Sequence, residues 1–393
     1  MVRLKCVFML LVVLLTAAFY STRVATGPGE EYVCPPCGCA NDGKVSHKPG
    51  VCDVCGMKLV LKGGAANLPP DAQPAAPRQK VAILIFDGVQ IIDYTGPYEV
   101  FGQAGFEVFT VAATPGTIRT AMGMQVTPHY TLENSPRPDV IVVPGGDVQR
   151  AQSDQRTIKW LQERAPEAQH VLSVCNGAYI LAHTGLLDGL AATTFYDLID
   201  GLKVAAPKTR VVRDQRYVDN GKIITTAGIS SGIDGSLYVV AKLRGKAAAQ
   251  MVALNMEYNY RPGSDYARGN FADRYLRAIF TRRLRFATPD GVSLQVLSTE
   301  GDAEKWEVNW QVDGRITEAE LLKLIGERLA GDGKWKPLAA AKNPSRWQFS
   351  GEAGDVWQGE VTVRPLTADK GRQQVTIRIN RAAGNKAASL KTQ

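Results

Sequence analysis

The sequence lacks a long run of Lys or Arg, although its formal net charge at pH 7 is +8. The positive charge is therefore spread along the chain, and no stretch marks a nucleic-acid-binding segment. No internal repeat is found, so nothing indicates a repeat architecture. The charged fraction is 21% and the hydrophobic fraction is 45%, which excludes disorder over the whole chain. With 393 residues, the chain is long enough for two or three domains.

The N-terminus contains the longest apolar run. Residues 1–5 are basic, and residues 6–20 are apolar. This order is typical of an export signal, which we place at residues 1–25. The run is shorter than the ~20 residues that cross a bilayer comfortably, and an uncleaved membrane anchor is the alternative. We therefore expect an exported protein, periplasmic or otherwise extracytoplasmic, that is either released or tethered to the membrane.

Cysteine is scarce outside one short segment, because five of the seven cysteines lie within residues 34–55. Cys34 and Cys37 form one C-x2-C knuckle, and Cys52 and Cys55 form a second after a gap of fourteen residues. Four thiolates on two knuckles suit a tetrahedral zinc ion, or a softer ion such as Cu(I). A module of this size, at residues 30–61, cannot fold on apolar burial alone. Either a metal or a pair of disulfides must close it.

Three other side chains of this module are candidate ligands: Cys39, His47 and Met57. The thioether of Met57 favours copper, or else packs beneath a knuckle. The segments YVCPPCG and VCDVCGMKL resemble the short heavy-metal-binding domain found on efflux and membrane-fusion proteins, with Cys37 in place of a His. Residues 62–79 are rich in Ala, Pro and Gly and form the expected linker.

From residue 80 to residue 262, short β-branched runs alternate with helix-like segments. Such runs suit central strands that are buried on both faces, and the alternation predicts an α/β fold with a doubly wound parallel sheet. Ser153 is the expected N-cap of one helix, and the turn at residues 219–221 predicts a hairpin. The expected strands are residues 81–86, 107–113, 139–146 and 170–174, and the last two expected helices are residues 231–243 and 246–258.

Residues 263–287 are expected to be a basic helical connector, followed by a C-terminal domain at residues 288–382 and a tail at residues 383–393. Several strand-like segments and one helix, residues 317–331, indicate an α+β or β-rich fold. Five of the six tryptophans lie here, often alternating with polar residues, which predicts a half-buried antiparallel sheet. An aromatic binding surface is the alternative, although core packing is the commoner use.

Cys175 ends an apolar run at the start of a helix-like pattern. A strand-to-helix turn would present its side chain at the carboxyl edge of the sheet, where open α/β folds bind ligands. The N–H groups and dipole of the following helix favour thiolate, so we expect the thiol pKa to lie below its reference of about 8.5. Gly177 lets the backbone pass close by, and Asn176 is expected to line the pocket. Inert packing is the alternative role for a lone cysteine.

Residues 80–262 resemble the ThiJ/PfpI family of the class I glutamine amidotransferase-like superfamily. Four segments, ILIFDGVQIIDYTGPYEVF, DVIVVPGG, VCNGAYILAHTGLLDG and TTAGISSGIDGSLYVVAKL, occur in the family's order. The resemblance implies a flavodoxin-like sheet with a nucleophilic Cys175. In the isocyanide hydratase and AraC-regulator branch, it implies an acid at Asp93 that exchanges protons with the sulfur. It also implies a homodimer, no cofactor for this domain, and an oxyanion site at the N–H groups of Gly145 and Gly146.

The sequence departs from this family at two positions. Asn176 stands where hydrolase-like members have His and hydratase-like members have Thr, and Phe195 replaces a second His. His170 and His183 are expected to be structural, so a Cys-His-Asp/Glu triad has no local candidate. We therefore expect a hydratase or lyase of the isocyanide hydratase kind acting on a small electrophile. The alternative is a non-catalytic sensor of a ligand or of metal stress that uses the same pocket. For Asp93, the structural alternative is an N-cap.

Limited proteolysis tests the expected boundaries. Residues 62–79 offer little apolar surface to bury, so we expect them to be the most protease-sensitive interior segment and to release a stable fragment that begins near Lys80. Mass spectrometry of the fragments would identify the cleavage site. Resistance of this segment would mean that the cysteine module docks tightly on the α/β domain.

Overall fold

The computed structural model describes residues 31–34, 40–41, 43–54, 58–62, 78–264, 266–281, 283–338, 342–366 and 371–382. The expected export signal, most of the expected linker and the expected tail lie outside these residues. Among the described helices, none combines the length and the apolar character that a membrane crossing requires.

The chain divides into two compact units, Met1–Arg78 and Gln79–Gln393. In the described part of the first unit, three short strands pair antiparallel in the order β2-β1-β3. They are β1 (Tyr32–Val33), β2 (Val45–Ser46) and β3 (Val60–Leu61).

A mixed sheet organises the α/β part of the second unit. Its described strands follow the order β13-β14-β10-β9-β4-β5-β8. Neighbouring strands are parallel except β13 and β14, which form the predicted hairpin. The predicted flavodoxin-like α/β fold is therefore confirmed. The strands are β4 (Lys80–Leu84), β5 (Glu107–Ala112), β8 (Tyr130–Thr131), β9 (Val140–Val143), β10 (His170–Ser173), β13 (Tyr217–Asn220) and β14 (Ile223–Thr226).

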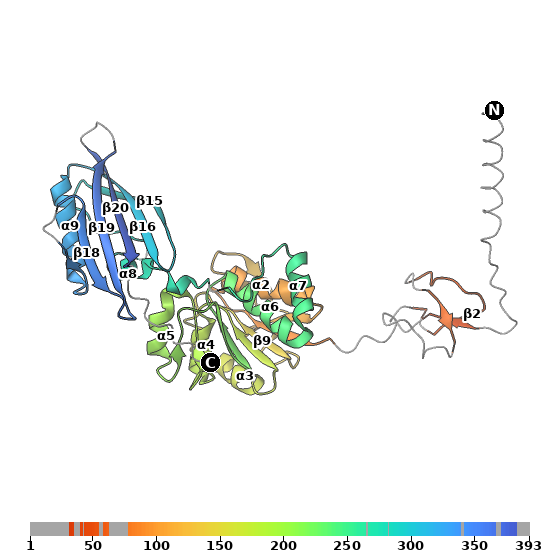
Figure 1. Cartoon of the computed structure of the whole chain (residues 1–393). Coiled ribbons are helices and arrows are strands. Elements are labelled where there is room, and N and C mark those ends of the chain that lie inside the picture. Colours follow the sequence, from red (N-terminus) through yellow and green to blue (C-terminus); the bar gives the residue numbers. More distant parts are fainter. Residues whose placement is uncertain are drawn as a thin grey trace, which may run out of the picture. The chain divides into compact units, whose positions relative to one another are not determined.

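Helices cover both faces of this sheet (Figure 1). Phe101 of α2 and Leu237 of α6 pack in the core on one face, whereas Leu161 of α3 and Leu181 of α4 pack in the core on the other. Because both faces are covered, β9 and β10 are buried at every residue, which explains their lack of polar alternation. The helices are α2 (Ile91–Gln103), α3 (Gln155–Arg164), α4 (Gly177–Thr184), α5 (Ile199–Ala205), α6 (Ser230–Arg244) and α7 (Lys246–Asn255).

The predicted N-cap of α3 is wrong by one residue. Asp154 caps this helix, and its side chain accepts a hydrogen bond from the N–H of Arg156. The hydroxyl of Ser153 donates instead to backbone carbonyls of the preceding turn. A carboxylate also interacts favourably with the positive end of the helix dipole. Two small ladders complete the α/β part: β6 (Ile118–Arg119) with β7 (Gln125–Val126), and β11 (Ala191–Ala192) with β12 (Arg210–Val211).

The connector is less helical than predicted. In its described residues, only a 3-10 turn, η4 (Arg268–Asn270), and one short helix, α8 (Asp273–Arg277), are helical. The arginines of this segment do not form a solvated helical face. Arg268 and Arg277 instead pair with the buried carboxylate of Asp273.

The C-terminal domain is an antiparallel sheet with α9 (Glu318–Gly331) packed on one face (Figure 1). The described strands follow the order β15-β16-β20-β19-β18-β17. All five of its tryptophans are buried, two of them completely, so core packing is confirmed and the alternative of an aromatic binding surface is wrong. The strands are β15 (Ser293–Gly301), β16 (Lys305–Asp313), β17 (Lys336–Pro337), β18 (Ser345–Ser350), β19 (Val356–Pro365) and β20 (Arg372–Arg381).

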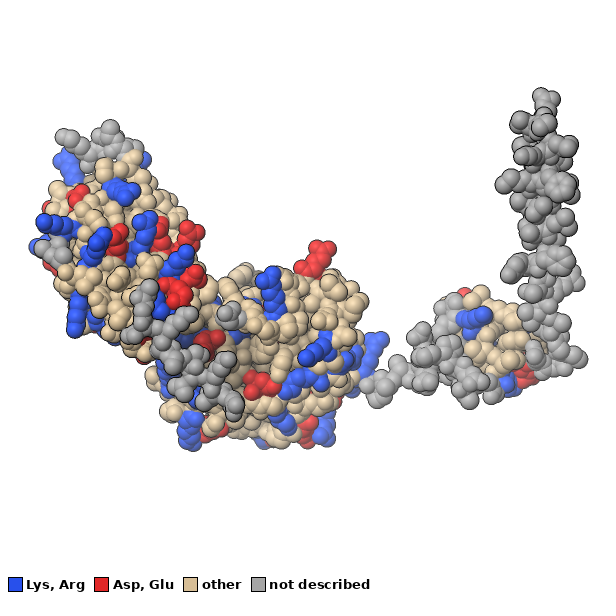
Figure 2. All heavy atoms as spheres, in the orientation of Figure 1, with Lys and Arg blue, Asp and Glu red and all other residues tan. Residues whose placement is uncertain are grey.

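Charged side chains of both signs intermingle on the face of the molecule shown in Figure 2. Surface ion pairs such as Arg372 with Asp313 and Arg346 with Glu360 join strands of the C-terminal sheet. The excess positive charge is thus mixed with acidic side chains on this face, as it is along the sequence.

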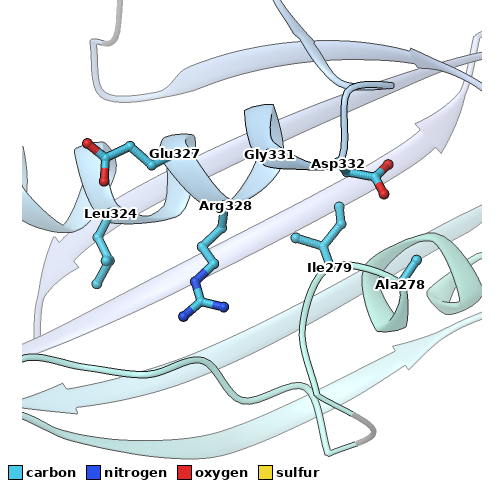
Figure 3. A pocket seen from close by; sticks show the side chains of 7 residues that line it. All are labelled: Ala278, Ile279, Leu324, Glu327, Arg328, Gly331 and Asp332. Atoms are coloured by element: carbon cyan, nitrogen blue, oxygen red, sulfur yellow. The ribbon is translucent and has the colours of Figure 1, made fainter.

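A hollow of about 440 Å³ lies in the C-terminal domain, between α9 and the segment that follows α8 (Figure 3). Its lining mixes acidic, basic and apolar side chains, and none of the site residues expected from the sequence is among them. The lining residues are Ala278, Ile279, Leu324, Glu327, Arg328, Gly331 and Asp332.

Candidate functional site

Cys175 occupies a sharp turn between β10 and α4. Its φ is 56°, in the left-handed region that non-glycine residues rarely adopt. Its N–H donates to the carbonyl of Ala227 at 3.0 Å. A Cβ atom at Gly177 would lie 2.0 Å from the carbonyl oxygen of Val143, so only glycine fits there. The predicted elbow geometry is present, and its strain indicates a functional position.

The site lies where the strand order reverses. β4 is followed in the chain by β5 on one side of it, whereas β9 lies on its other side. Ligands of open α/β sheets bind at this point, beyond the carboxyl ends of the strands. Asp93 comes from α2, the helix after β4, and Gly145 and Gly146 follow β9. Cys175 follows β10, so the connections after three neighbouring strands of the sheet, β4, β9 and β10, converge on one place.

Asp93 is completely buried in the first turn of α2. The N-cap of that helix is Gln90, so the alternative that Asp93 serves as the N-cap is wrong. Its Oδ2 accepts the N–H of Gly145 at 3.2 Å, and its Oδ1 is buried without a hydrogen-bond partner among the described residues. Burial raises the pKa of this carboxyl to about 6, although the Cys175 thiol and the Gly145 N–H act in the opposite direction. Asp93 therefore titrates close to neutral pH.

The thiol of Cys175 has a raised pKa, and the expectation of a lowered one is wrong. Only 8% of the residue is exposed, and burial is the largest cause of the increase. The negative charge of Asp93 adds to it, whereas the N–H groups of Asn176 and Ile229 favour the thiolate. Two N–H groups at a helix end do not outweigh desolvation next to a carboxylate. In the resting site the proton therefore belongs to the sulfur.

Asn176 fixes the loop that follows β9. Its Oδ1 accepts the N–H of Gly146 and its Nδ2 donates to the carbonyl of Gly146, both at 2.8 Å. The N–H groups of Gly145 and Gly146 thus already donate to Asp93 and Asn176, respectively. The carboxylate and the carboxamide thus occupy the two N–H groups in this structure, and their role as oxyanion donors stays a prediction. The asparagine side chain has a positioning role that the sequence did not reveal.

Two contacts of the cysteine were missed by sequence reasoning. Ile229 has φ 46° and ψ −94°, and its N–H is directed toward the sulfur. Thr194 donates its hydroxyl to the carbonyl of Cys175 at 2.9 Å. Ile229 belongs to one of the segments that carry the family resemblance, and Thr194 directly precedes Phe195, but neither carries a side chain that signals acid–base chemistry. The ring of Phe195 packs directly against Gly228. A Cβ atom added to Gly228 would lie only 2.4 Å from Cδ2 of that ring.

The histidines of the α/β part have structural contacts. His170 is buried at the start of β10, and Nδ1 of His183 lies 2.8 Å from the carbonyl oxygen of Tyr179 within α4. Nδ1 of His129 contacts the hydroxyl of Thr110 at 2.8 Å. The expectation that no Cys-His-Asp/Glu triad forms around Cys175 therefore agrees with the described residues.

The cysteine module is described only in part. Cys34 and Cys52 are buried, with 2% and 5% of each residue exposed, whereas His47 is exposed. Nδ2 of Asn41 lies 3.7 Å from Sγ of Cys52. No group of three metal-ligating side chains occurs within the described residues. The other predicted ligands lie outside the residues that the structure describes: Cys37, Cys39, Cys55 and Met57.

Comparisons with known proteins match both parts of the chain. The model of the DJ-1/PfpI family matches residues 79–242, and that of the heavy metal binding domain matches residues 31–62. The HTH-type transcriptional regulator GbdR of Pseudomonas aeruginosa is 23% identical over 183 residues, which cover 44% of this chain and 49% of that protein. A crystal structure of a ThiJ/PfpI family protein from Pseudomonas syringae shares 30% identity, with coverage of 50% and 83% and a TM-score of 0.45.

A further relative is similar over most of its own length. The isonitrile hydratase of Pseudomonas putida is 37% identical over 191 residues, which cover 47% of this chain and 81% of that protein. The family match includes Asp93, the loop after β9 and the elbow at Cys175. On this identity and coverage, the chain belongs to the DJ-1/PfpI family.

Proposed function

We propose that the α/β domain is a cysteine-dependent hydratase that adds water to a small neutral electrophile, an isonitrile in the first instance. The observation that carries the proposal is the buried pair of Cys175 and Asp93 at a strained strand-to-helix turn. A carboxyl group with a pKa of about 6 can accept and return a proton near neutral pH. The relative named isonitrile hydratase supports the choice of substrate class.

The reaction begins with attack of the Cys175 sulfur on the terminal carbon of the isonitrile. As the C–S bond forms, the thiol proton passes through Asp93 to that carbon and gives a thioimidate, R–N=CH–S–Cys. Water then adds across the C=N bond, one proton going to nitrogen and the hydroxyl to carbon. Cleavage of the C–S bond returns the proton to sulfur and releases the formamide R–NH–CHO. Asp93 acts as base and then as acid, and the covalent intermediate divides one difficult addition into two easier steps.

The surroundings of the pair favour a small, uncharged substrate. The thiol and the carboxyl are both buried, so an anionic ligand would lose its hydration and meet the negative charge of Asp93. Phe195 places an apolar ring against the apolar cluster that contains Cys175. These features support an electrophile with an apolar substituent over a peptide or a carboxylate.

Turnover of isonitriles tests the proposal. The purified full-length protein is expected to convert small alkyl and aryl isonitriles to formamides, followed by NMR, and Cys175→Ser should lower the rate by at least about a thousandfold. His183→Ala is a matched control, because Nδ1 of His183 contacts the carbonyl of Tyr179 within its own helix, and it should keep the wild-type rate. Saturable binding of an isonitrile without any turnover would contradict the hydratase and favour the sensor that was the alternative from the sequence.

Asp93→Asn separates acid–base chemistry from charge. The substitution removes a negative charge that raises the thiol pKa, so ultraviolet thiolate absorbance should show a lower pKa for Cys175. Turnover should nevertheless be lost, because the amide cannot transfer the proton. A variant that keeps its turnover would contradict the general-base role.

The difference in stability between the wild type and this variant should depend on pH. The folded-state pKa of Asp93, about 6, lies above its ordinary value of 3.8, so the folded protein binds this proton more tightly than the unfolded chain. This stabilisation is fully present below pH 3.8 and is lost as pH rises through about 6. Asp93→Asn has no such loss. The free energy of unfolding of the variant minus that of the wild type should therefore increase by at most about 3 kcal/mol from pH 4 to pH 7. Urea unfolding at both pH values measures the difference, and an equal difference at both would contradict the raised pKa.

We also propose that the protein is exported and that the module matched by the heavy metal binding domain holds one soft ion, zinc or Cu(I). The N-terminal basic and apolar segments support export, and the two buried thiols of Cys34 and Cys52 support a thiolate site. Cys37 and Cys55 would complete the ligand set. The ion would crosslink a segment that is too small to fold on apolar burial.

Metal analysis tests this second proposal. The protein purified without chelator should contain about one zinc or copper ion per chain, and replacing Cys52 and Cys55 together with Ser should remove it. Cys6→Ser is the matched control, since Cys6 is not in the module, and should leave the metal content unchanged. The thermal unfolding of residues 80–262 should be unaffected by the double substitution. Absence of metal together with disulfides among Cys34, Cys37, Cys52 and Cys55 in mass spectrometry would contradict the metal site.

A further inference from the structure

Two short segments flank Cys175 and contact its backbone. The loop at residues 194–198 does so through the hydroxyl of Thr194, which donates to the carbonyl of Cys175 at 2.9 Å. The turn at residues 227–230 does so through the carbonyl of Ala227, which accepts the N–H of Cys175 at 3.0 Å. A displacement of either segment would therefore change the geometry of the elbow.

The connector to the C-terminal domain holds the first of these segments. The guanidinium groups of Arg268 and Arg277 lie 4.4 Å and 4.6 Å from the ring centroid of Tyr196. Nη1 of Arg277 also lies 2.8 Å from Oδ1 of Asp197. Asp273 fixes both arginines, since its carboxylate accepts two hydrogen bonds of 2.7 Å from Arg268 and one of 3.0 Å from Arg277. Asp273 is 2% exposed, so this cluster is a rigid internal contact.

The connector also reaches the second segment. Nη2 of Arg216 donates to the hydroxyl of Ser230 at 3.3 Å, and the same guanidinium pairs with the buried Asp234. The ring of Tyr266, in the connector, lies 5.3 Å from this guanidinium carbon. Ser230 directly follows Ile229, whose N–H is directed toward the sulfur of Cys175. Contacts from the connector therefore end one residue away from a group that touches the nucleophile.

We propose that residues 266–277, in the connector to the C-terminal domain, are a positioning element that sets the reactivity of Cys175. The proposal rests on the proposed function only in taking Cys175 as the reacting group. Ile229 has φ 46° and ψ −94°, and a β-branched residue keeps such a conformation only where its neighbours impose it. When the connector contacts are lost, the segment that holds the Cys175 carbonyl through Thr194 shifts, the sulfur moves away from the N–H of Ile229, and the thiolate loses a stabilising donor.

Alkylation of Cys175 measures this effect without substrate turnover. Iodoacetamide is the probe, and mass spectrometry of the peptide that contains Cys175 gives the rate at each pH. Tyr196→Leu removes the ring that both arginines contact, so we expect the rate at neutral pH to fall about tenfold and the midpoint of the pH profile to rise. Tyr196→Phe keeps the ring and should match the wild type. Arg372→Met, which removes a surface ion pair of the C-terminal sheet, is the control and should also match it.

If Tyr196→Leu had the same pH midpoint as the wild type, the proposal would be overturned. A faster reaction at that unchanged midpoint would show that the substitution changes only the access of iodoacetamide to Cys175. Should Tyr196→Leu fail to fold, Arg268→Lys carries the same expectation, because it keeps the charge and loses the planar, two-bond contact with Asp273. If these variants behave as expected while the wild type hydrates no isonitrile, the proposed function fails and the positioning role stands.

Discussion

The rest of the site depends on the burial of two acids next to one another. Asp93 and Cys175 are both removed from water, and neither can ionise without cost while the other carries charge. The proton therefore stays on the sulfur at rest, and Asp93, with a pKa of about 6, is the group able to accept it near neutral pH. In the proposed reaction, the sulfur is unreactive at rest and becomes nucleophilic when its proton passes through Asp93 to the substrate.

Strain keeps this pair in position. Cys175 and Ile229 both have positive φ, and conformations of this kind persist only when the surrounding structure imposes them. Here the surrounding structure is a set of short connections tied by hydrogen bonds: Asn176 to Gly146, Asp93 to Gly145, and Thr194 to the nucleophile. Among these contacts, the carboxamide of Asn176 fixes the connection after β9 through two hydrogen bonds to Gly146.

Much of the fold could be predicted from the sequence because its signals are local. The β-branched runs of β9 and β10 and the glycine at position 177 depend only on near neighbours. The hydrogen bond from Gly145 to Asp93 joins residues 52 positions apart, and no spacing reveals it. The prediction of a lowered thiol pKa failed for a related reason. A helix N-terminus can be recognised in the sequence, whereas the depth of burial cannot. The prediction of a helical connector failed because the arginines of this segment pair with residues, such as Asp197, that are distant in the chain.

The uneven placement of tryptophan has a practical consequence. Five of the six indole groups lie in the C-terminal core, and the α/β domain contains only Trp160, whose Nε1 donates to the hydroxyl of Ser135. Intrinsic fluorescence of the whole protein therefore reports mainly on the C-terminal core. Denaturation curves followed by tryptophan emission would describe the unfolding of that core. Unfolding of the α/β domain would change the emission only slightly. A second probe, such as far-ultraviolet circular dichroism, is required to follow it.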